Sequence, residues 1–233
     1  MSRQPPAQQP PPVQKLLVKY GKVGPARFAS HRDFARAFER ALRRAEVPMA
    51  FSSGFSPHPR LSYINPAATG AASWAEYLVI GLRQIRQPAA VMADLAAAMP
   101  AGFPILAVSP LVDAAVFEAS QWQVDWPGAE PAGLATAIAR FDAASAIEIV
   151  RQTKTGPRRF DVKPALVAGP ALVVGGESPT ESPTLTMVLR HTVPLVRPDD
   201  VAVALRAVAP KLPDVPVLAT RLAQGTVADL TTG

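Results

Sequence analysis

The hydrophobic positions of the first half follow two different periods, and each period predicts a different kind of element. Recurrence every three or four residues predicts a helix, whereas alternation or a short dense run predicts a strand. The predicted elements are a strand at 13–23, a helix at 31–46, extended segments at 50–51 and 60–64, a strand at 76–82, a helix at 88–99 and a strand at 103–108. This βαββαβ order is that of the ferredoxin-like unit.

The second half repeats the order, with an insertion after a hairpin. Its predicted elements are a strand at 122–126, a helix at 131–143, hairpin strands at 146–153 and 158–162, a strand at 184–190, a helix at 198–208 and a strand at 217–222. Residues 111–120 are predicted to be a linker and residues 175–183 a loop. We therefore expect an α+β fold of tandem ferredoxin-like (βαββαβ) domains, each an antiparallel sheet with helices on one face. The expected divisions are a disordered tail at 1–12, a first domain at 13–112 and a second at 121–230.

The predicted helix at 31–46 has a hydrophobic face and a basic face. Ser30 followed by Asp33 is the pattern of a capping box, which satisfies amide groups at a helix start. At about 100° per residue, one side of the helix carries Phe34, Ala37, Phe38, Ala41, Leu42 and Ala45. The other side carries Arg32, Arg36, Arg40 and Arg43. Such guanidinium groups repel one another and suit phosphate or carboxylate, so we expect an anion there; the alternative is a solvated face.

The loop that follows this helix concentrates polar groups. Residues 52–60 read SSGFSPHPR, and Pro57 and Pro59 are expected to hold the backbone extended around His58. We expect His58 and Arg60 to shape an anion pocket in which Ser53 takes part. The alternative is a rigid loop with one surface histidine.

Positive charge gathers in the first quarter of the chain. The net charge is +6, and the segment from Val13 to Ile64 holds ten Lys or Arg against three acidic residues. A second basic cluster is predicted around the hairpin turn, at Lys154, Arg158, Arg159 and Lys163; most charged hairpin tips are only soluble turns. Clusters of this kind favour a polyanion, although an acidic protein surface would serve equally well. The candidate anion-binding residues are Arg27, Arg32, Arg36, Arg40, Arg43, Ser53, His58, Arg60, Lys154 and Arg158.

Composition excludes several classes of protein. The chain has no cysteine and three scattered histidines, so we expect no disulfide, no iron–sulfur cluster and no metal site. No hydrophobic run approaches the ~20 residues that a membrane span needs, and the polar, proline-rich start is unlike a secretion signal; we expect a cytoplasmic protein. Aromatic residues make up only 6%, which disfavours a base-stacking sheet like that of RNA-recognition domains.

The side chains allow one catalytic hypothesis. Nucleotide-binding loops, dinucleotide fingerprints and serine-hydrolase elbows are missing from the sequence. Metal-independent RNA cleavage remains, with His31 or His58 as general acid or base and Tyr20 as a partner. The analogy is to CRISPR repeat-processing endonucleases with tandem ferredoxin-like domains, and rests on fold alone. His31 can equally be a first-turn helix residue satisfied by the backbone.

Residues 24–66 resemble the N-terminal signature of a bacterial family of unknown function, the radical SAM-linked or radical SAM-associated proteins. That pattern is a G-P-x-R-F-x-S-H turn, a helix with paired arginines, and G-F-x-P-H-P before a basic residue. The matching residues are Gly24, Pro25, Arg27, Phe28, Ser30, His31, Arg43, Arg44, Gly54, Phe55, Pro57, His58, Pro59 and Arg60. The later KTGPRRFDVKPAL also resembles the family's second hairpin, so the likeness covers roughly residues 13–224.

The resemblance implies an accessory role. Members of that family occur alone or joined to a cobalamin-binding radical SAM protein, so SAM, the iron–sulfur cluster and cobalamin are expected on the partner and no cofactor in this chain. Our leading hypothesis is a non-enzymatic module that presents an anionic substrate such as RNA to a radical SAM enzyme. A metal-independent ribonuclease and a protein–protein adaptor without nucleic acid are the alternatives.

Overall fold

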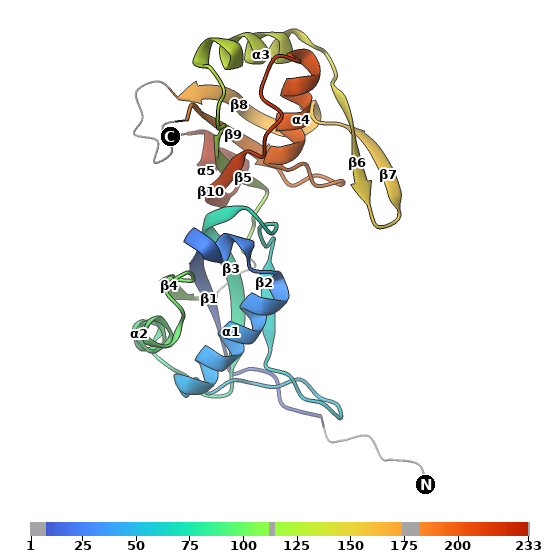
Figure 1. Ribbon diagram of the computed structural model, residues 1–233. Coiled ribbons are helices and arrows are strands. Elements are labelled where there is room, and N and C mark those ends of the chain that lie inside the picture. Colours follow the sequence, from blue (N-terminus) through green and yellow to red (C-terminus); the bar gives the residue numbers. More distant parts are fainter. Residues whose placement is uncertain (1–7, 112–114, 174–181, 233) are drawn as a thin grey trace. The chain divides into compact units, whose positions relative to one another are not determined.

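The computed structural model describes residues 8–111, 115–173 and 182–232. The chain divides into two compact units, Met1–Ala115 and Val116–Gly233, which we call the N-terminal and C-terminal units (Figure 1). The fold is mixed α and β with antiparallel strand pairing, and the described residues contain five α-helices. None of these helices is long and hydrophobic enough to cross a membrane.

The N-terminal unit follows the predicted βαββαβ order. Its elements are β1 (Gln14–Lys22), α1 (His31–Arg44), β2 (Leu61–Ile64), β3 (Ala72–Leu82), α2 (Pro88–Ala98) and β4 (Ile105–Pro110), with a short 3₁₀ turn, η1 (Gly24–Phe28), before α1. β1 pairs with β3 and β4, and β2 pairs with β3, so the sheet order is β4-β1-β3-β2. β3 begins four residues before the predicted strand at 76–82.

The ends of α1 are determined locally. The Ser30 hydroxyl oxygen accepts from the Asp33 amide at 3.2 Å, and the Asp33 carboxylate accepts from the Ser30 amide at 3.2 Å and its hydroxyl at 2.6 Å. These bonds form the predicted capping box and lower the pKa of Asp33. The helix ends at Arg44 rather than at residue 46, because Glu46 adopts a φ of 49°. That conformation is left-handed and does not continue a helix.

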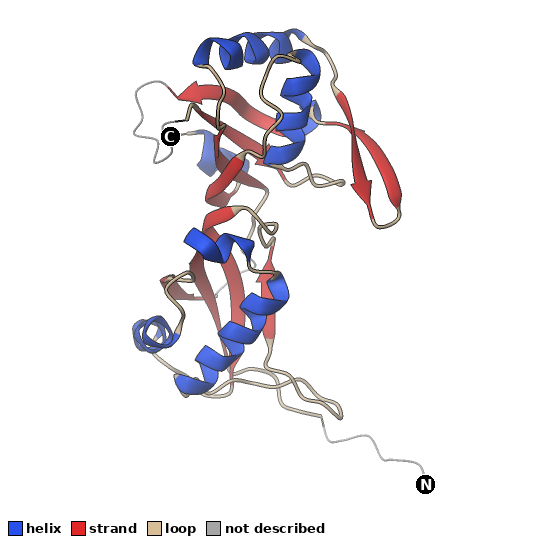
Figure 2. Cartoon of the chain, in the orientation of Figure 1, coloured by secondary structure: helices blue, strands red, loops and turns tan. Residues whose placement is uncertain are grey.

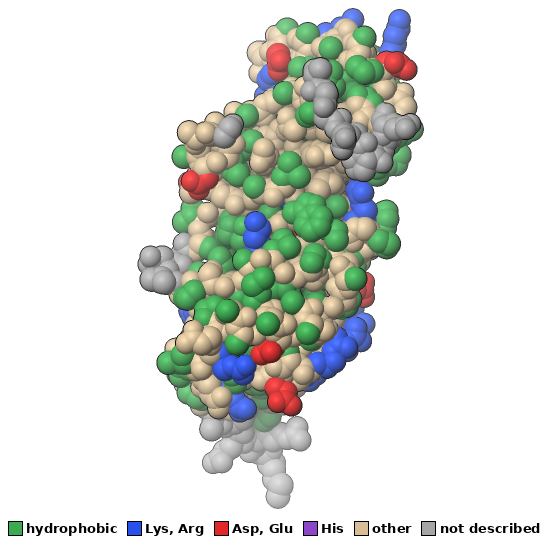
Figure 3. Space-filling model, turned by 90° about the vertical axis from the view of Figure 1, so that its left-hand side faces the viewer, with side chains coloured by type: hydrophobic (Ala, Val, Ile, Leu, Met, Phe, Trp, Pro, Cys, Tyr) green, Lys and Arg blue, Asp and Glu red, His purple; other side chains and the backbone are tan. Residues whose placement is uncertain are grey.

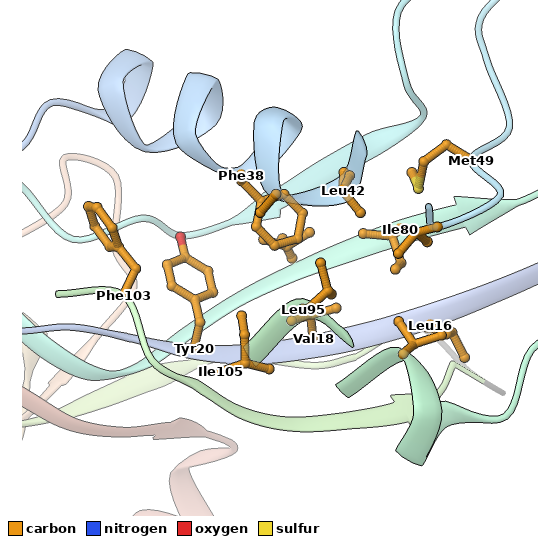
Figure 4. Packing of buried hydrophobic residues seen from close by; sticks show 14 of the residues in the cluster. Leu16, Val18, Tyr20, Phe38, Leu42, Met49, Ile80, Leu95, Phe103 and Ile105 are labelled. Carbon is orange, nitrogen blue, oxygen red and sulfur yellow. The ribbon is translucent and has the colours of Figure 1, made fainter. Parts of the chain in front are cut away.

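Both helices of this unit pack on one face of its sheet (Figure 4). Alternate residues of a strand face the same side, and the buried alternate residues are Leu16, Val18 and Tyr20 of β1 and Leu78, Ile80 and Leu82 of β3. Phe38 and Leu42 of α1 and Leu95 of α2 join them in one cluster. Burying each such side chain contributes about 1.5–3 kcal/mol, so this cluster fixes α1 on the sheet.

The C-terminal unit also has four strands that pair with one another. Its elements are β5 (Ala119–Asp125), α3 (Pro131–Ala143), β6 (Glu148–Thr153), β7 (Gly156–Asp161), the 3₁₀ turn η2 (Lys163–Ala165), β8 (Leu166–Val173), β9 (Thr184–Arg190), α4 (Pro198–Val208), β10 (Leu218–Gly225) and α5 (Val227–Thr231). The strand order within the unit is β10-β5-β9-β8. Among the described strands, β6 and β7 pair only with each other, and this ribbon extends away from the sheet (Figure 2).

The place of the hairpin in the sheet was predicted wrongly. The β6–β7 ribbon forms its own two-stranded sheet, and the strand that pairs with the far side of β9 is β8, for which no strand was predicted. The reason lies within β8, because its register with β9 shifts at Ala168 and Ala171. Gly169 between them has a φ of 75°, and its Cα lies so close to the Thr186 carbonyl that a Cβ would approach it to 2.5 Å. The break conceals the strand in the hydrophobic pattern.

The predicted connections are only partly described. Residues 1–7 of the predicted tail, residues 112–114 of the predicted linker and most of the predicted 175–183 loop lie outside the described residues. Within the linker, residues 119 and 120 belong to β5. Residues 8–12 of the tail lie against the N-terminal unit: the Gln9 amide donates to the Ser53 hydroxyl at 2.8 Å, and Pro12 packs on Gly81.

Candidate anion-binding site

The exposed side of α1 is basic, as the sequence predicts. Arg32, Arg36, Arg40 and Arg43 are exposed, while Phe34, Phe38 and Leu42 on the opposite side are buried. Among the residues that the structure describes, none of these four guanidinium groups has an ion pair or a hydrogen bond. We call this set the α1 basic face. In the space-filling view, Lys and Arg side chains gather along one edge of the N-terminal unit, with a few acidic side chains beside them (Figure 3).

A pocket of about 690 Å³ opens beside the C-terminal half of α1. Three segments that are distant in sequence form it: the end of α1 with residues 46–51, the loop at 57–59, and the connection from β3 to α2. Its charged and polar lining comprises Glu39, Arg43, Glu46, His58, Arg83, Gln84 and Arg86. Its apolar lining comprises Leu42, Val47, Pro48, Met49, Phe51, Pro57 and Pro59. Arg43 therefore belongs both to the α1 basic face and to this pocket, which we call the His58 pocket.

The loop that carries His58 is closed on itself by hydrogen bonds. The Ser52 amide donates to the His58 carbonyl at 2.8 Å, and the His58 amide donates to the Ser52 hydroxyl oxygen at 3.0 Å. Phe51 and Pro59 form an isolated β-bridge at its base. At the turn, Gly54 has a φ of 126°, which other residues rarely adopt. The imidazole of His58 is thus exposed on a braced loop, held by Ser52 as well as by the flanking prolines.

Arg60 and Ser53 make hydrogen bonds that hold this loop, and neither residue lines the His58 pocket. The Arg60 guanidinium donates from Nε to the Phe51 carbonyl at 3.1 Å, and Ser53 accepts from Gln9. Arg60 lines a different hollow of about 800 Å³, next to Lys15. The structure therefore separates Arg60 from His58, because its side chain bonds to its own loop.

Arg27 also bonds to the backbone. Its Nε donates to the Gly70 carbonyl at 2.5 Å, and the Gly70 amide donates back to the Arg27 carbonyl at 2.8 Å. The guanidinium carbon lies 5.8 Å from the centre of the Phe28 ring. Arg27 thus ties the 24–28 turn to the turn that precedes β3 and lies outside the His58 pocket.

The proposed catalytic residues are not gathered in one place. His31 is exposed in the first turn of α1, with its ring 4.4 Å from that of Tyr63, whereas the α1 residues of the His58 pocket begin at Glu39, about 12 Å farther along the axis. Tyr20 is only 3% exposed and stacks on Phe34 at 4.3 Å, so it lies in the core. Burial raises the pKa of Tyr63 to about 12, and its hydroxyl oxygen is buried with no hydrogen-bond partner in the described part of the chain.

Of the four basic residues predicted around the ribbon turn, two remain exposed and unpaired among the described residues. Lys154 and Arg158 lie at the exposed end of the β6–β7 ribbon. Arg159 pairs with Glu148 at 3.2 Å. Lys163 is bound at the ribbon base, where its ammonium group donates to the Phe141 carbonyl at 2.9 Å. Farther along the ribbon, Arg151 forms a salt bridge of 2.7 Å with the buried Asp200.

Two basic residues of the pocket were not among the sequence-predicted candidates. Arg83 and Arg86 follow the end of β3 in the stretch RQIR, and the Arg86 guanidinium forms a salt bridge of 3.1 Å with Asp94 of α2. A basic pair directly after a dense hydrophobic strand is the signal that marks them. Because they are distant in sequence from the 52–60 loop, the sequence does not indicate that they line the same pocket as His58.

Comparison with known proteins identifies one family. Residues 15–198 match the model of a family described as an uncharacterised protein conserved in bacteria, DUF2344. Curated proteins give no match. Within the described ranges, no group of three or more His, Cys, Asp or Glu side chains is placed to hold a metal ion.

Proposed function

We propose that this chain, which belongs to the DUF2344 family of uncharacterised bacterial proteins, binds an anionic substrate and does not act on it alone. The substrate we propose is RNA, recruited for a radical SAM partner that holds the iron–sulfur cluster, SAM and cobalamin. The binding module consists of two ferredoxin-like units. The strand orders β4-β1-β3-β2 and β10-β5-β9-β8 support that description, because each runs fourth, first, third, second within its own unit.

The observation that carries the proposal is the α1 basic face. Four guanidinium groups project from one side of a well-packed helix, and none of them forms an ion pair within the described residues, although Arg36 and Arg32 lie near enough to Asp33 to help lower the pKa of its carboxyl. Like charges three or four positions apart destabilise a helix by about 0.2–0.5 kcal/mol per pair. A bound phosphate removes this repulsion and accepts the guanidinium hydrogens in pairs. The face is therefore suited to an anion.

The length of this face favours a chain of anions over a single one. From Arg32 to Arg43 the helix rises by about 16 Å, which exceeds the reach of one phosphate. The first arginines also lie near the helix N-terminus, whose dipole favours negative charge. A polyanion such as RNA satisfies all four residues together. Lys154 and Arg158 form a separate exposed basic group that we propose as an additional contact.

The ribonuclease hypothesis lacks comparable support. His31 and His58 lie at different ends of α1, and Tyr20 is buried in the core. General acid–base cleavage needs two groups within hydrogen-bond reach of one phosphate. The described arrangement of these three side chains does not provide that pair.

The test is a binding measurement with a control variant in the C-terminal unit. We will compare the unmodified protein with the variant in which Arg32, Arg36, Arg40 and Arg43 are changed to Gln, using fluorescence anisotropy of labelled RNA. The control variant R190Q/K211Q removes two exposed charges from the C-terminal unit. We expect the fourfold variant to lose RNA binding and the control to keep it.

Two results would reject the RNA proposal. Equal affinity of the fourfold variant and the unmodified protein would show that the α1 basic face does not bind the RNA. Displacement of a copurified acidic protein, with no RNA binding by the unmodified protein, would favour the adaptor alternative. Intact RNA after prolonged incubation with a chelator is expected, and cleavage lost in His58→Ala would establish an enzyme instead.

A further inference from the structure

The His58 pocket combines three chemistries in one cavity. Arg43, Arg83 and Arg86 supply positive charge and hydrogen-bond donors, His58 supplies imidazole nitrogens, and Glu39 and Glu46 supply carboxylate acceptors. Leu42, Val47, Met49 and Phe51, with three prolines, supply apolar walls. A ligand that matches all three kinds of lining must carry a negative charge, hydrogen-bond donors and a flat or apolar body. A simple anion would leave the carboxylates and the apolar walls without a partner.

We propose that the His58 pocket receives one unpaired nucleotide of the bound RNA. The substrate is then RNA with a single-stranded end or loop, and not a continuous duplex. This inference rests on the proposed RNA binding and specifies its substrate class. The phosphate of the nucleotide contacts the arginines, the exocyclic amino group of its base donates to a carboxylate, and the ring lies against the apolar walls.

The carboxylates give the strongest reason to place a base in the pocket. Glu39 lies on α1 between the arginines of the basic face, and Glu46 follows the helix end. A carboxylate beside a phosphate site opposes binding unless it accepts a hydrogen from the same ligand. The amino groups of cytosine, adenine and guanine are such donors, and Glu is a recognised acceptor from cytosine N4.

Exposed aromatic side chains supply the stacking surface. The exposed Phe and Trp side chains of the described residues are Phe28, Phe51, Phe55 and Trp74, all in the N-terminal unit. Phe51 lines the pocket and is 41% exposed, and Phe55, 67% exposed, lies on the loop that carries His58. The chain is poor in aromatic residues overall, so these rings suit one or two bases and not an extended platform. Because hydrogen bonds already brace the loop, little ordering cost remains on binding.

The size of the pocket agrees with a nucleotide. Its volume of about 690 Å³ lies within the range of small-molecule sites, about 300–1,000 Å³. A base inside a duplex must first unstack and unpair, which costs a few kcal/mol, whereas an unpaired base enters without that cost. The pocket therefore selects single-stranded over duplex positions.

The row of arginines that continues away from the pocket favours a nucleotide over a peptide end as its ligand. The carboxylate, ammonium and side chain of a peptide end also match the three chemistries of the pocket. Arg43, however, is shared with the α1 basic face, which continues away from the pocket through Arg40, Arg36 and Arg32. A peptide end leaves that row of arginines unoccupied, whereas an RNA strand leaving the pocket follows it.

The experiment uses a duplex with a single-stranded overhang that carries the fluorescent base 2-aminopurine, and a blunt duplex with the same number of phosphates. We expect the overhang RNA to bind roughly 5- to 150-fold more tightly, the range of one aromatic–base stack. Its 2-aminopurine emission should change on binding. The Phe51→Ala variant should lose this preference and the emission change while keeping affinity for the blunt duplex.

A second variant keeps the test valid if Phe51→Ala disturbs the loop. Glu39→Gln preserves side-chain size, and we expect it to reduce the preference for overhangs whose base carries an amino group over those with uracil. Equal affinity for overhang and blunt RNA, with an unchanged 2-aminopurine signal, would overturn the pocket assignment but leave RNA binding intact. Absence of binding to either RNA would reject the proposed function itself. A free tripeptide that binds the pocket while mononucleotides do not would identify it as a peptide site.

Discussion

Replacing Arg40 by Gln should have opposite effects on stability and on RNA binding. Arg40 has three basic neighbours at helical contact spacing, Arg36, Arg43 and Arg44, and no acidic residue three or four positions away. Each like-charged pair destabilises a helix by about 0.2–0.5 kcal/mol. Arg and Gln have nearly equal helix propensity, so removing the three pairs should stabilise the free protein by about 0.6–1.5 kcal/mol. In a chain of this size that corresponds to a rise in Tm of about 2–5 °C.

The same substitution should remove one phosphate contact. Four contacts to single-stranded RNA give a slope of log affinity against log salt of about −2.8, and three give about −2.1. Between about 50 and 200 mM salt, the affinity of the unmodified protein should therefore fall about 50-fold and that of Arg40→Gln about 20-fold. At low salt the variant should bind more weakly.

Two measurements check this prediction. Thermal unfolding at low and high salt gives the stability difference, which should shrink at high salt because the repulsion is screened. Anisotropy titrations of labelled RNA over the same salt range give the slopes, with Arg190→Gln in the C-terminal unit as the matched control. A lower Tm for Arg40→Gln would show that Arg40 makes a favourable contact in the free protein. Identical salt slopes for the variant and the unmodified protein would refute the contact with phosphate.

Three further predictions concern the framework of the two units. Phe38→Ala should destabilise the N-terminal unit by about 3–5 kcal/mol, because the ring is fully buried between α1 and the sheet; denaturant unfolding measures it, and a loss below about 1 kcal/mol would contradict this packing. Asp200→Ala should release Arg151 and lower the free energy of unfolding by about 2 kcal/mol or more, a value between those of exposed and buried ion pairs. Hydrogen exchange should then accelerate in the β6–β7 ribbon but not in β5. Equal acceleration in both would disprove that the Arg151–Asp200 salt bridge holds the ribbon. Burial lowers the pKa of His191, whose Nδ1 donates to the Phe117 carbonyl and whose Nε2 accepts from the Ser120 hydroxyl, each at 2.8 Å. On acidification the unfolded state therefore takes up a proton before the folded state does, so the free energy of unfolding should fall from about pH 6.5 downward until the lowered pKa is passed. His191→Asn should remove that part of the pH dependence. An unchanged pH profile would exclude His191 as its source.

Local sequence signals predicted α1 and its two faces without any long-range information. Ser30 and Asp33 are three residues apart, so the capping box needs only the helix start to form. The separation of Phe34, Phe38 and Leu42 from Arg32, Arg36 and Arg40 follows from the helical period alone. The element order of the N-terminal unit was predicted for the same reason, because each element carries its own periodicity.

Long-range pairing explains where sequence reasoning failed. β8 was missed because Gly169 and two register shifts break the alternation that identifies a strand. The ribbon was predicted to be part of the sheet, since its two strands have ordinary strand patterns. The pairing of β8 with β9 shows that β8, and not the ribbon, lies beside β9 in the sheet.

The sequence by itself determined which arginines share the exposed side of α1, because that side is fixed by residues within two or three helical turns. Only the tertiary structure decided which basic residues remain available to a ligand. Arg27 and Lys163 donate to carbonyl oxygens of residues more than 20 positions away, and Arg60 bonds within its own closed loop. The fold likewise brought Arg83 and Arg86 beside Arg43 and His58. The physical reason is that a guanidinium or ammonium group binds any acceptor within reach, and the packing of distant segments decides which acceptors those are.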